Sequence, residues 1–474
     1  MTLSIATIPG AQRELDRLAS GPKSRHFRMT MKLGAEFDDR GLRLLPGASD
    51  PPHYLCNLVL QGGGALGLAH VGFVAGLEQA GVRFVGLAGT SAGAIVACAT
   101  ACARENTIQK PVAEALLELV SAMPMASFID GPPVVRTLLK RFFGRQNLYS
   151  GATVLGGLTA FRHLLKYRGL NPGEEFLRWL ELAYAQMGIK TVEDLDGRLA
   201  AIVSQLRKAS LPRDWSDDNR PNAAPAREWR EAFPEDLDPP RRRHDPKIKP
   251  FDLLQVMAMA QPAGIKFCFP EDLKYLAPSY RKDSPACFVR ASMSVPAFFH
   301  PHYMNVDEKA WAGRVERHLG KFEAPGVVLE LKRLRSVAFL DGGLLSNLPL
   351  DAFSRIPAVP TLAVSLAEAT DPLKAEYRYS SSIRGAARDA GLLLNGMRRQ
   401  RDLDARDRAN RPTNPQGDIS LVSIDTKDAN WLNFSMDRGE MADLFMCGLE
   451  AARKFILTDY FRESDDERTE LAAG

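Results

Sequence analysis

The hydrophobic positions from residue 55 onward follow an order typical of a sheet with crossover helices. Residues 55–60 form a short apolar run between turn residues, which predicts a buried strand. Apolar residues then recur at helical spacing up to Gly81, residues 82–88 predict a second strand, and a second helix is expected over 94–102. Strand, loop, helix, strand, turn and helix in this order predict an α/β fold with a mostly parallel sheet.

The middle of the chain has a different pattern. Residues 111–187 are largely helical in periodicity, whereas residues 212–250 lose periodicity and are rich in Pro, Arg, Asp and Glu. We therefore expect a helical cap or insertion over residues 104–211. We also expect a polar, mobile surface segment over residues 212–250.

Strand-like apolar segments return in the second half of the chain. They cover residues 253–260, 266–269, 337–340, 361–366 and 419–424. An Arg-rich helix with a solvated face is predicted over 382–411, and a final helix over 438–456. The expected organisation is an N-terminal extension of unclear role (1–51), one domain (52–456) and a charged C-terminal tail (457–474).

Composition and charge exclude several classes of protein. The 474 residues are 45% hydrophobic and carry a net charge of +4, which is too small to favour nucleic acid as the main partner. The first residues lack the pattern of a secretory signal, so a cytoplasmic protein is expected. The apolar window 86–103 predicts buried core and not a membrane span, because its Gly-Thr-Ser-Ala-Gly turn would expose backbone groups to lipid.

The cysteines give no sign of a metal site or a disulfide framework. They are scattered along the chain, without a C-x-x-C pair or a histidine at metal-ligand spacing. We expect buried free thiols and no metal.

A glycine-rich loop, LQGGGALG, occupies residues 60–67. Gly62, Gly64 and Gly67 fit the dinucleotide fingerprint, but the backbone N–H groups of such a loop can also hold another anion. An NAD(P)-dependent oxidoreductase requires an acidic residue about 20 positions further on, at the end of the second strand, to bind the ribose. That strand instead ends in Gly89 and leads into Ser91.

Ser91 is the candidate nucleophile. Residues 89–93, Gly-Thr-Ser-Ala-Gly, match G-x-S-x-G between a predicted strand and a predicted helix, which is the context of a nucleophile elbow. Any side chain larger than that of Gly89 or Gly93 would collide with the neighbouring strand and helix. The alternative interpretation of Ser91 is a helix N-cap.

The base that would activate Ser91 is the next question. A triad of the α/β-hydrolase type needs a late histidine, but the last histidine is His318, and His300 and His302 are the best of a weak set. Asp341 instead follows an apolar strand and precedes Gly342 and Gly343. Active sites of open α/β folds collect at the ends of strands in a parallel sheet, so we expect Asp341 to lie at the same sheet edge as Ser91.

Four motifs together resemble the patatin-like phospholipase family. They are GGGALG at 62–67, GTSAG at 89–93, ASMSVPAFFHP at 291–301 and DGGLLSNLP at 341–349, and the resemblance covers roughly residues 52–456. It implies a patatin-type three-layer α/β/α sandwich with a central, mostly parallel sheet. It also implies hydrolysis of acyl esters of phospholipids and neutral lipids by a Ser-Asp dyad, with no metal or other cofactor.

Site residues follow from this resemblance by position. Ser91 would be the nucleophile and Asp341 the base, while Gly62, Gly63 and Gly64 would supply the oxyanion hole. Supporting positions in the motifs are Gly67, Gly89, Gly93, Gly342 and Gly343. One departure is Leu66, because many family members carry Arg or Lys there.

The resemblance also implies contact with lipid. Residues 134–145 combine basic and large apolar side chains as interfacial helices do, although an ordinary amphipathic helix has the same pattern. We hypothesise that the cap covers the cleft and touches a bilayer, which implies a peripheral membrane association. Two alternatives stay open, namely the NAD(P)-binding oxidoreductase and a non-catalytic patatin-like binding or regulatory module.

Overall fold

The architecture was obtained from a computed structural model of the chain. The structure describes residues 2–19, 54–137, 160–207, 248–353, 359, 361–367, 419–427, 429, 433 and 436–456. Residues 212–247 of the predicted polar segment 212–250, the Arg-rich helix predicted over 382–411 and the tail 457–474 lie outside the described residues. So does the predicted interfacial stretch beyond residue 137.

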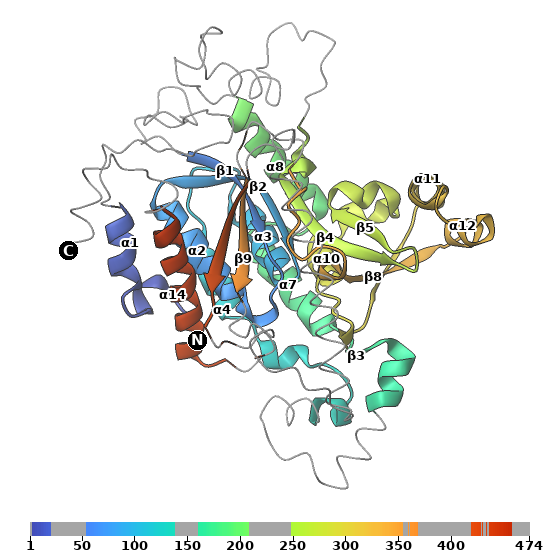
Figure 1. Ribbon diagram of the computed structural model, residues 1–474, viewed down its shortest axis with the longest axis horizontal. Coiled ribbons are helices and arrows are strands. Elements are labelled where there is room, and N and C mark those ends of the chain that lie inside the picture. The colour runs from blue at the N-terminus through green and yellow to red at the C-terminus, as the bar shows by residue number, and fades with distance from the viewer. Residues whose placement is uncertain are drawn as a thin grey trace, which may run out of the picture.

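Within the described residues, eight strands form one sheet in the order β10-β9-β1-β2-β4-β8-β7, with β5 paired to β4 beside this path (Figure 1). The strands of this sheet are β1 (Tyr54–Leu60), β2 (Val82–Thr90), β4 (Leu254–Gln261), β5 (Ile265–Phe269), β7 (His302–Asn305), β8 (Ser336–Asp341), β9 (Thr361–Ala367) and β10 (Ile419–Asp425). A separate pair joins β3 (Gly169–Asn171) to β6 (Ala297–Phe299).

Helices flank this sheet (Figure 1). They are α1 (Ala11–Ala19), α2 (Gly67–Gln79), α3 (Ala92–Ala103), α4 (Ala113–Ser121), α7 (Glu174–Gln186), α8 (Val192–Arg207), α10 (Ala286–Ser292), α11 (Glu308–Leu319), α12 (Pro325–Lys332) and α14 (Arg438–Phe455). Short 3₁₀ turns include η2 (Gly64–Leu66), η3 (Met125–Phe128) and η8 (Gly342–Leu344). A further helix is described over residues 160–167.

The fold class agrees with the prediction. Strands β10, β9, β1, β2 and β4 pair in parallel, and β4 pairs antiparallel with β5 and β8. Every residue of β2 is buried, which means that both faces of the sheet are covered there. The result is a mixed, mostly parallel sheet with flanking helices, as an α/β/α sandwich requires.

Part of the N-terminal extension belongs to the core. Leu3, Ile8 and Leu15 are buried in the same hydrophobic cluster as the central strands. Helix α1 packs against α2 and α14. The sequence offered no motif for residues 1–51, and the packing of α1 gives part of this segment a structural role.

The predicted cap between residues 104 and 211 is mainly helical in its described parts. It contains α4, α7 and α8 together with the turn η3, but it also contributes the strand β3. Within the described part of the chain, no helix is both long and apolar enough to cross a membrane. The six cysteines are free; five are buried and Cys268 is partly exposed.

Helices α2 and α14 pack unusually closely because each has a glycine at the crossing. A Cβ atom added to Gly448 would lie 1.9 Å from the carbonyl oxygen of Ala69 in α2. In the reverse direction, a Cβ added to Gly72 would lie 1.9 Å from the carbonyl oxygen of Phe445 in α14. Backbone atoms cannot move aside as flexible side chains can, so the crossing requires glycine on both helices.

A buried histidine connects α2 to the loop that precedes it. The side chain of His70 has no exposed surface, and its Nε2 lies 2.8 Å from the carbonyl oxygen of Gln61. Burial lowers the pKa of His70 from 6.5 to about 4, against the opposing effect of that hydrogen bond. A neutral imidazole therefore holds the start of the glycine-rich loop at neutral pH.

The crossing of α2 and α14 predicts that Gly448→Ala destabilises the protein. The added methyl group collides with the Ala69 carbonyl, so we expect the free energy of unfolding to fall by about 1–3 kcal/mol. Gly197, within α8, is the matched control because an added Cβ has no atom within 4 Å. Gly197→Ala should raise stability by about 0.5–1 kcal/mol. Urea denaturation of both variants is the measurement, and an unchanged midpoint in Gly448→Ala would contradict the close crossing.

His70 predicts an acid-sensitive stability. Unfolded His70 takes up a proton near pH 6.5 and the folded residue only near pH 4, so stability is fully present above pH 6.5 and is lost as the pH falls towards 4. Over that interval the loss is about 3 kcal/mol. In His70→Gln an amide donor is kept without the titration, so its unfolding free energy should depend less on pH. Equal pH slopes for the two proteins in denaturant titrations would refute this role.

Candidate active site

Ser91 forms the turn between a strand and a helix. Strand β2 ends at Thr90 and α3 begins at Ala92, so this one residue reverses the direction of the chain. Its backbone has φ 54° and ψ −120°, a conformation that residues other than glycine rarely adopt and that stores strain. Such a turn holds the serine side chain at the tip of the strand, as in a nucleophile elbow.

The glycines of the elbow have the steric role predicted from the sequence. A Cβ on Gly89 would lie 2.3 Å from the backbone of Gly93, and a Cβ on Gly93 would lie 2.3 Å from the carbonyl oxygen of Leu60 in β1. The prediction that larger side chains collide here with the strand and the helix is confirmed. Their absence lets α3 approach the sheet closely enough to form the turn.

The hydroxyl of Ser91 does not cap the helix. Although Ser91 occupies the N-cap position of α3, its side chain makes no capping hydrogen bond. Its Oγ lies 3.2 Å from the Sδ of Met293, while its backbone N–H donates to the Oγ of Ser292 at 2.9 Å. The residue is 6% exposed, so little of its surface is open to solvent.

Strands β2 and β8 meet end to end along one edge of β4. Residues 256 and 257 of β4 pair with both β2 and β5, and residues 258–260 pair with both β5 and β8. Because a strand has only two edges, β5 occupies one of them, and β2 and β8 share the other. Thr90 pairs with Met257 and Asp341 pairs with the next residue, Ala258. The carboxyl ends of the two strands therefore converge beside Ser91.

This arrangement corrects one expectation. The sequence predicts Asp341 at the end of a strand in a parallel sheet, but β8 is antiparallel to both β4 and β7. Asp341 still comes close to Ser91, because β4 extends beyond the end of β2 and β8 runs back along this extension. The carboxyl ends of β2 and β8 meet because the two strands run towards each other along β4. Parallel strands would instead end side by side at one edge of the sheet.

Asp341 is held in position by backbone contacts. It is 3% exposed, its N–H donates to the carbonyl oxygen of Ser294 at 2.9 Å, and its Oδ1 accepts the Gly343 N–H at 2.7 Å. A Cβ on Gly342 would lie 2.3 Å from the carbonyl oxygen of Met257, so the chain passes tightly over β4. Residues 292–294 consequently contact Ser91 at one end and Asp341 at the other.

Asn347 joins the Asp341 segment to the glycine-rich loop. Its carbonyl oxygen accepts the Gly62 N–H and its Nδ2 donates to the Gly62 carbonyl oxygen, both at 3.1 Å. A Cβ on Gly62 would lie 2.5 Å from Asn347 Oδ1 and 3.1 Å from the Cβ of Ser91. The N–H of Gly62 is therefore already bonded to Asn347, whereas the family resemblance implied it as one of three oxyanion donors.

The other two glycines of the loop lie at the start of η2. Gly64 has φ 56°, a conformation that favours glycine, and Gly63 occupies the N-cap position of this turn. The first N–H groups of a helical turn have no partner within it, so they are suited to hold an anion. A Cβ added to Gly67 would lie 3.7 Å from the Cβ of Ala92, which is an ordinary van der Waals distance, and Leu66 is buried.

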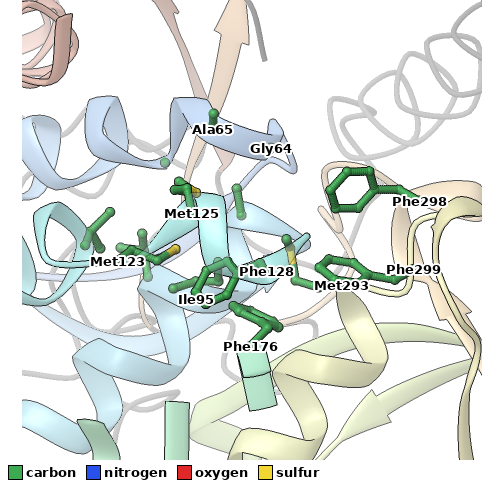
Figure 2. Close-up of a pocket in the computed structure, with 14 residues that line it drawn as sticks. Gly64, Ala65, Ile95, Met123, Met125, Phe128, Phe176, Met293, Phe298 and Phe299 are labelled. Carbon is green, nitrogen blue, oxygen red and sulfur yellow. The ribbon is translucent and has the colours of Figure 1, made fainter. Parts of the chain in front are cut away.

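An apolar pocket adjoins the start of α3, and Figure 2 shows the residues that line it. The space between its walls, including the part that is open to solvent, is about 480 Å³. It is lined by Gly64, Ala65, Gly67, Ala92, Ile95, Val96, Val120, Met123, Met125, Phe128, Phe176, Met293, Phe298 and Phe299. Figure 2 shows Met123 at one end and Phe298 at the other, with Met293 between them. Because Met293 also touches Ser91 Oγ, the serine borders this pocket.

A buried arginine fastens the cap to the site. Arg290 donates to the carbonyl oxygens of Pro172, Gly173 and His300 and to the hydroxyl of Ser294. Burial lowers the pKa of Arg290 to about 10, partly offset by the negative charge of Asp130. The guanidinium thus links the segment before α7 to the residue that holds Asp341.

The candidate histidines lie elsewhere. His300 Nε2 is 3.3 Å from His163 Nε2, and the His300 ring stacks on Tyr167 with 5.2 Å between centroids. His302 lies in β7 opposite Phe339. Ser91 Oγ is instead in contact with Met293. Among the described residues, no three His, Cys, Asp or Glu side chains form a group that could hold a metal ion.

Several site residues were not recognised individually in the sequence. Ser292 and Met293 were quoted within ASMSVP and Asn347 within SNLP, but their roles depend on contacts with Ser91 and Gly62, more than 200 positions away. Arg290 and the aromatic lining from the cap gave no local signal. The available indication was the motif at 291–301, in which no residue had an assigned role, and the unassigned end of the motif at 341–349.

Comparisons with known proteins identify the family of this chain. One solved structure with a similar chain is the crystal structure of VipD from Legionella pneumophila, with 15% sequence identity and a TM-score of 0.35, covering 94% of this chain and 73% of that chain. No curated protein matches this chain. The family model of the patatin-like phospholipases matches residues 58–354. This match extends over more than half of the chain, from β1 to beyond Asp341, and the chain therefore belongs to the patatin-like phospholipase family.

Proposed function

We propose that the protein hydrolyses fatty-acyl ester bonds of phospholipids or related lipids through an acyl-Ser91 intermediate, with Asp341 as the base. Lipid acyl hydrolysis in general follows from the family. The observation that carries the specific proposal is the convergence of β2 and β8 on one edge of β4. It brings a strained serine and a buried aspartate together at the side of an apolar pocket.

The first half of the reaction forms the acyl-enzyme. Ser91 Oγ attacks the ester carbonyl carbon while Asp341 accepts the hydroxyl proton. The carbonyl oxygen becomes an oxyanion, for which the N–H groups of Gly63 and Gly64 are the proposed donors, since that of Gly62 is bonded to Asn347. The tetrahedral intermediate then collapses, the alcohol part of the lipid leaves with the proton from Asp341, and the acyl group stays on Ser91.

The second half releases the fatty acid. Asp341 takes a proton from a water molecule that attacks the acyl-serine, and the proton returns to Ser91 Oγ as the ester bond breaks. The elbow and the Asn347 contacts fix the positions of the glycine donors before the reaction begins. Donors fixed in this way stabilise the oxyanion without reorganisation, and one such donor is typically worth about 10²–10³ in rate.

The pocket is the proposed site of the acyl chain. Its lining consists of apolar side chains and backbone, and aromatic rings from the cap close one side, with Phe128 and Phe176 edge to face at 5.0 Å. An alkyl chain gains free energy when it leaves water for such a surface. The lining has no carboxylate for a ribose, and nothing among the described residues favours an NAD(P) cofactor or a non-catalytic role.

The dyad predicts two losses of activity. Ser91→Ala should abolish labelling by a fluorophosphonate probe, and Asp341→Asn should lower kcat on an ester by about 10²–10⁴-fold because the base is lost. Ser336→Ala and Asp351→Asn are matched controls. The Ser336 hydroxyl bonds the Met304 carbonyl, and Asp351 pairs with Lys266 at the surface. Persistent labelling of Ser91→Ala would falsify the nucleophile, and a normal rate in Asp341→Asn would exclude the base.

The pocket predicts control of chain length by Ile95, which lies one helical turn after Ser91 and is 5% exposed. Ile95→Phe adds bulk to the lining, so the rate on a palmitoyl ester should fall about tenfold relative to that on a butyryl ester. Ile95→Val, which removes one methyl group, should keep the wild-type ratio. The measurement is kcat/KM on p-nitrophenyl esters of both lengths. An unchanged ratio in Ile95→Phe would mean that the acyl chain lies outside this pocket.

A further inference from the structure

The helix of residues 160–167 exposes apolar side chains on its outer face. Phe161 is 55% exposed and Leu165 is 56% exposed, and their spacing of four residues puts them on the same side of the helix. His163 and Tyr167 lie on the opposite side, where both rings contact His300. The contact with His300 seats the helix on the protein, so Phe161 and Leu165 face away from it.

The charge around this apolar pair has one sign. Arg162, Lys166 and Arg168 are exposed, and the sequence from 160 to 171 contains no acidic residue. A helix with exposed apolar residues flanked by Lys and Arg is the pattern that lies in the interface of an anionic bilayer. The charge is therefore complementary to a negatively charged lipid surface.

The helix is joined to the wall of the pocket. It leads directly into β3, which pairs with β6, and Phe298 and Phe299 of β6 line the pocket (Figures 1 and 2). Asn171 reinforces this connection, because its Nδ2 donates to the Phe298 carbonyl oxygen and its own carbonyl oxygen accepts the His300 N–H. A surface bound by the 160–167 helix would thus lie beside the end of the pocket that Phe298 borders.

A second exposed apolar group lacks these properties. Phe322, Val327 and Leu329 are exposed around α11 and α12, but acidic residues Glu323 and Glu330 lie among them. These two helices lie apart from β3 in Figure 1, and none of their residues lines the pocket. Phe322, which is 82% exposed, therefore provides a matched control for Phe161.

We propose that the 160–167 helix docks on an anionic lipid bilayer through Phe161 and Leu165, with Arg162 and Lys166 on the headgroups. Docking at this place brings the Phe298 end of the pocket to the membrane. A lipid acyl chain can then pass from the bilayer towards Ser91 with little exposure of the chain to water. The role of docking in substrate access rests on the proposed function. The docking surface itself is defined by its exposed apolar side chains and the positive charges beside them.

The test uses the full chain and two separate readouts. Binding is measured by co-sedimentation with vesicles of phosphatidylcholine alone or of phosphatidylcholine mixed with phosphatidylglycerol. Catalysis is measured on a soluble butyryl ester, which needs no membrane. The variants are Phe161→Ser with Leu165→Ser, Arg162→Gln with Lys166→Gln, and Phe322→Ser as the control.

The expected result is a loss of membrane binding without a loss of chemistry. The Phe161 and Leu165 double variant should bind mixed vesicles at least about tenfold more weakly, and its rate on the butyryl ester should equal that of the wild type. The Arg162 and Lys166 double variant should lose the preference for phosphatidylglycerol. Phe322→Ser should bind as the wild type does.

Three results would overturn the docking surface. They are wild-type vesicle binding by the Phe161 and Leu165 variant, equal weakening by Phe322→Ser, or a change of oligomeric state in the Phe161 and Leu165 variant with vesicle binding intact, which would identify a second copy as the occupant. A failure of the proposed function is distinguishable, because the wild-type protein would then bind vesicles but would not hydrolyse the butyryl ester.

Discussion

The site depends on how the backbone groups of β4 are paired along one edge. Buried N–H and C=O groups need partners, and this edge obtains them from two strands in succession, β2 in parallel and β8 in antiparallel. Since each of these strands runs towards the other, their carboxyl ends meet at Met257 and Ala258. Any shift in either register would move Ser91 or Asp341 away from that meeting point.

Main-chain contacts then fix the reacting groups in place. Ser292 and Ser294 contact the backbones of Ser91 and Asp341, and Asn347 bonds both backbone groups of Gly62. Few of these contacts depend on long, mobile side chains. The arrangement is therefore preorganised, which is what stabilisation of a developing oxyanion requires.

The cap is part of the same construction and not an independent addition. Arg290 joins carbonyl groups at the start of α7 to the hydroxyl of Ser294, so the segment that holds Asp341 also holds the cap. The cap in turn supplies Phe128 and Phe176 to the pocket. The surface helix of residues 160–167 is joined to the wall of the pocket by the β3–β6 pair. Pocket, cap and docking surface are thus connected through a few hydrogen bonds and ring contacts.

The sequence by itself determined the local elements and the identity of the elbow. The predicted strand 55–60 corresponds to β1 (Tyr54–Leu60), and 82–88 lies within β2 (Val82–Thr90). These two strand predictions are confirmed because the pattern of apolar residues that indicates a buried strand involves only neighbouring positions. The glycines at 89 and 93 could likewise be interpreted from the sharpness of a strand-to-helix turn.

Only the tertiary structure decided three features. They are the direction of β8, the hydrogen bond of the Gly62 N–H to Asn347, and the hydrogen bonds of Arg290 to the cap and to Ser294. An apolar strand has the same pattern whichever way it runs, so its sequence does not specify which strand it pairs with. The bond from Asn347 to Gly62 spans 285 positions and that from Ser91 to Ser292 spans 201. Contacts between residues so far apart in the chain arise from the packing of whole helices and strands. The sequence could therefore identify candidate site residues, but only the fold determined which of them contact one another.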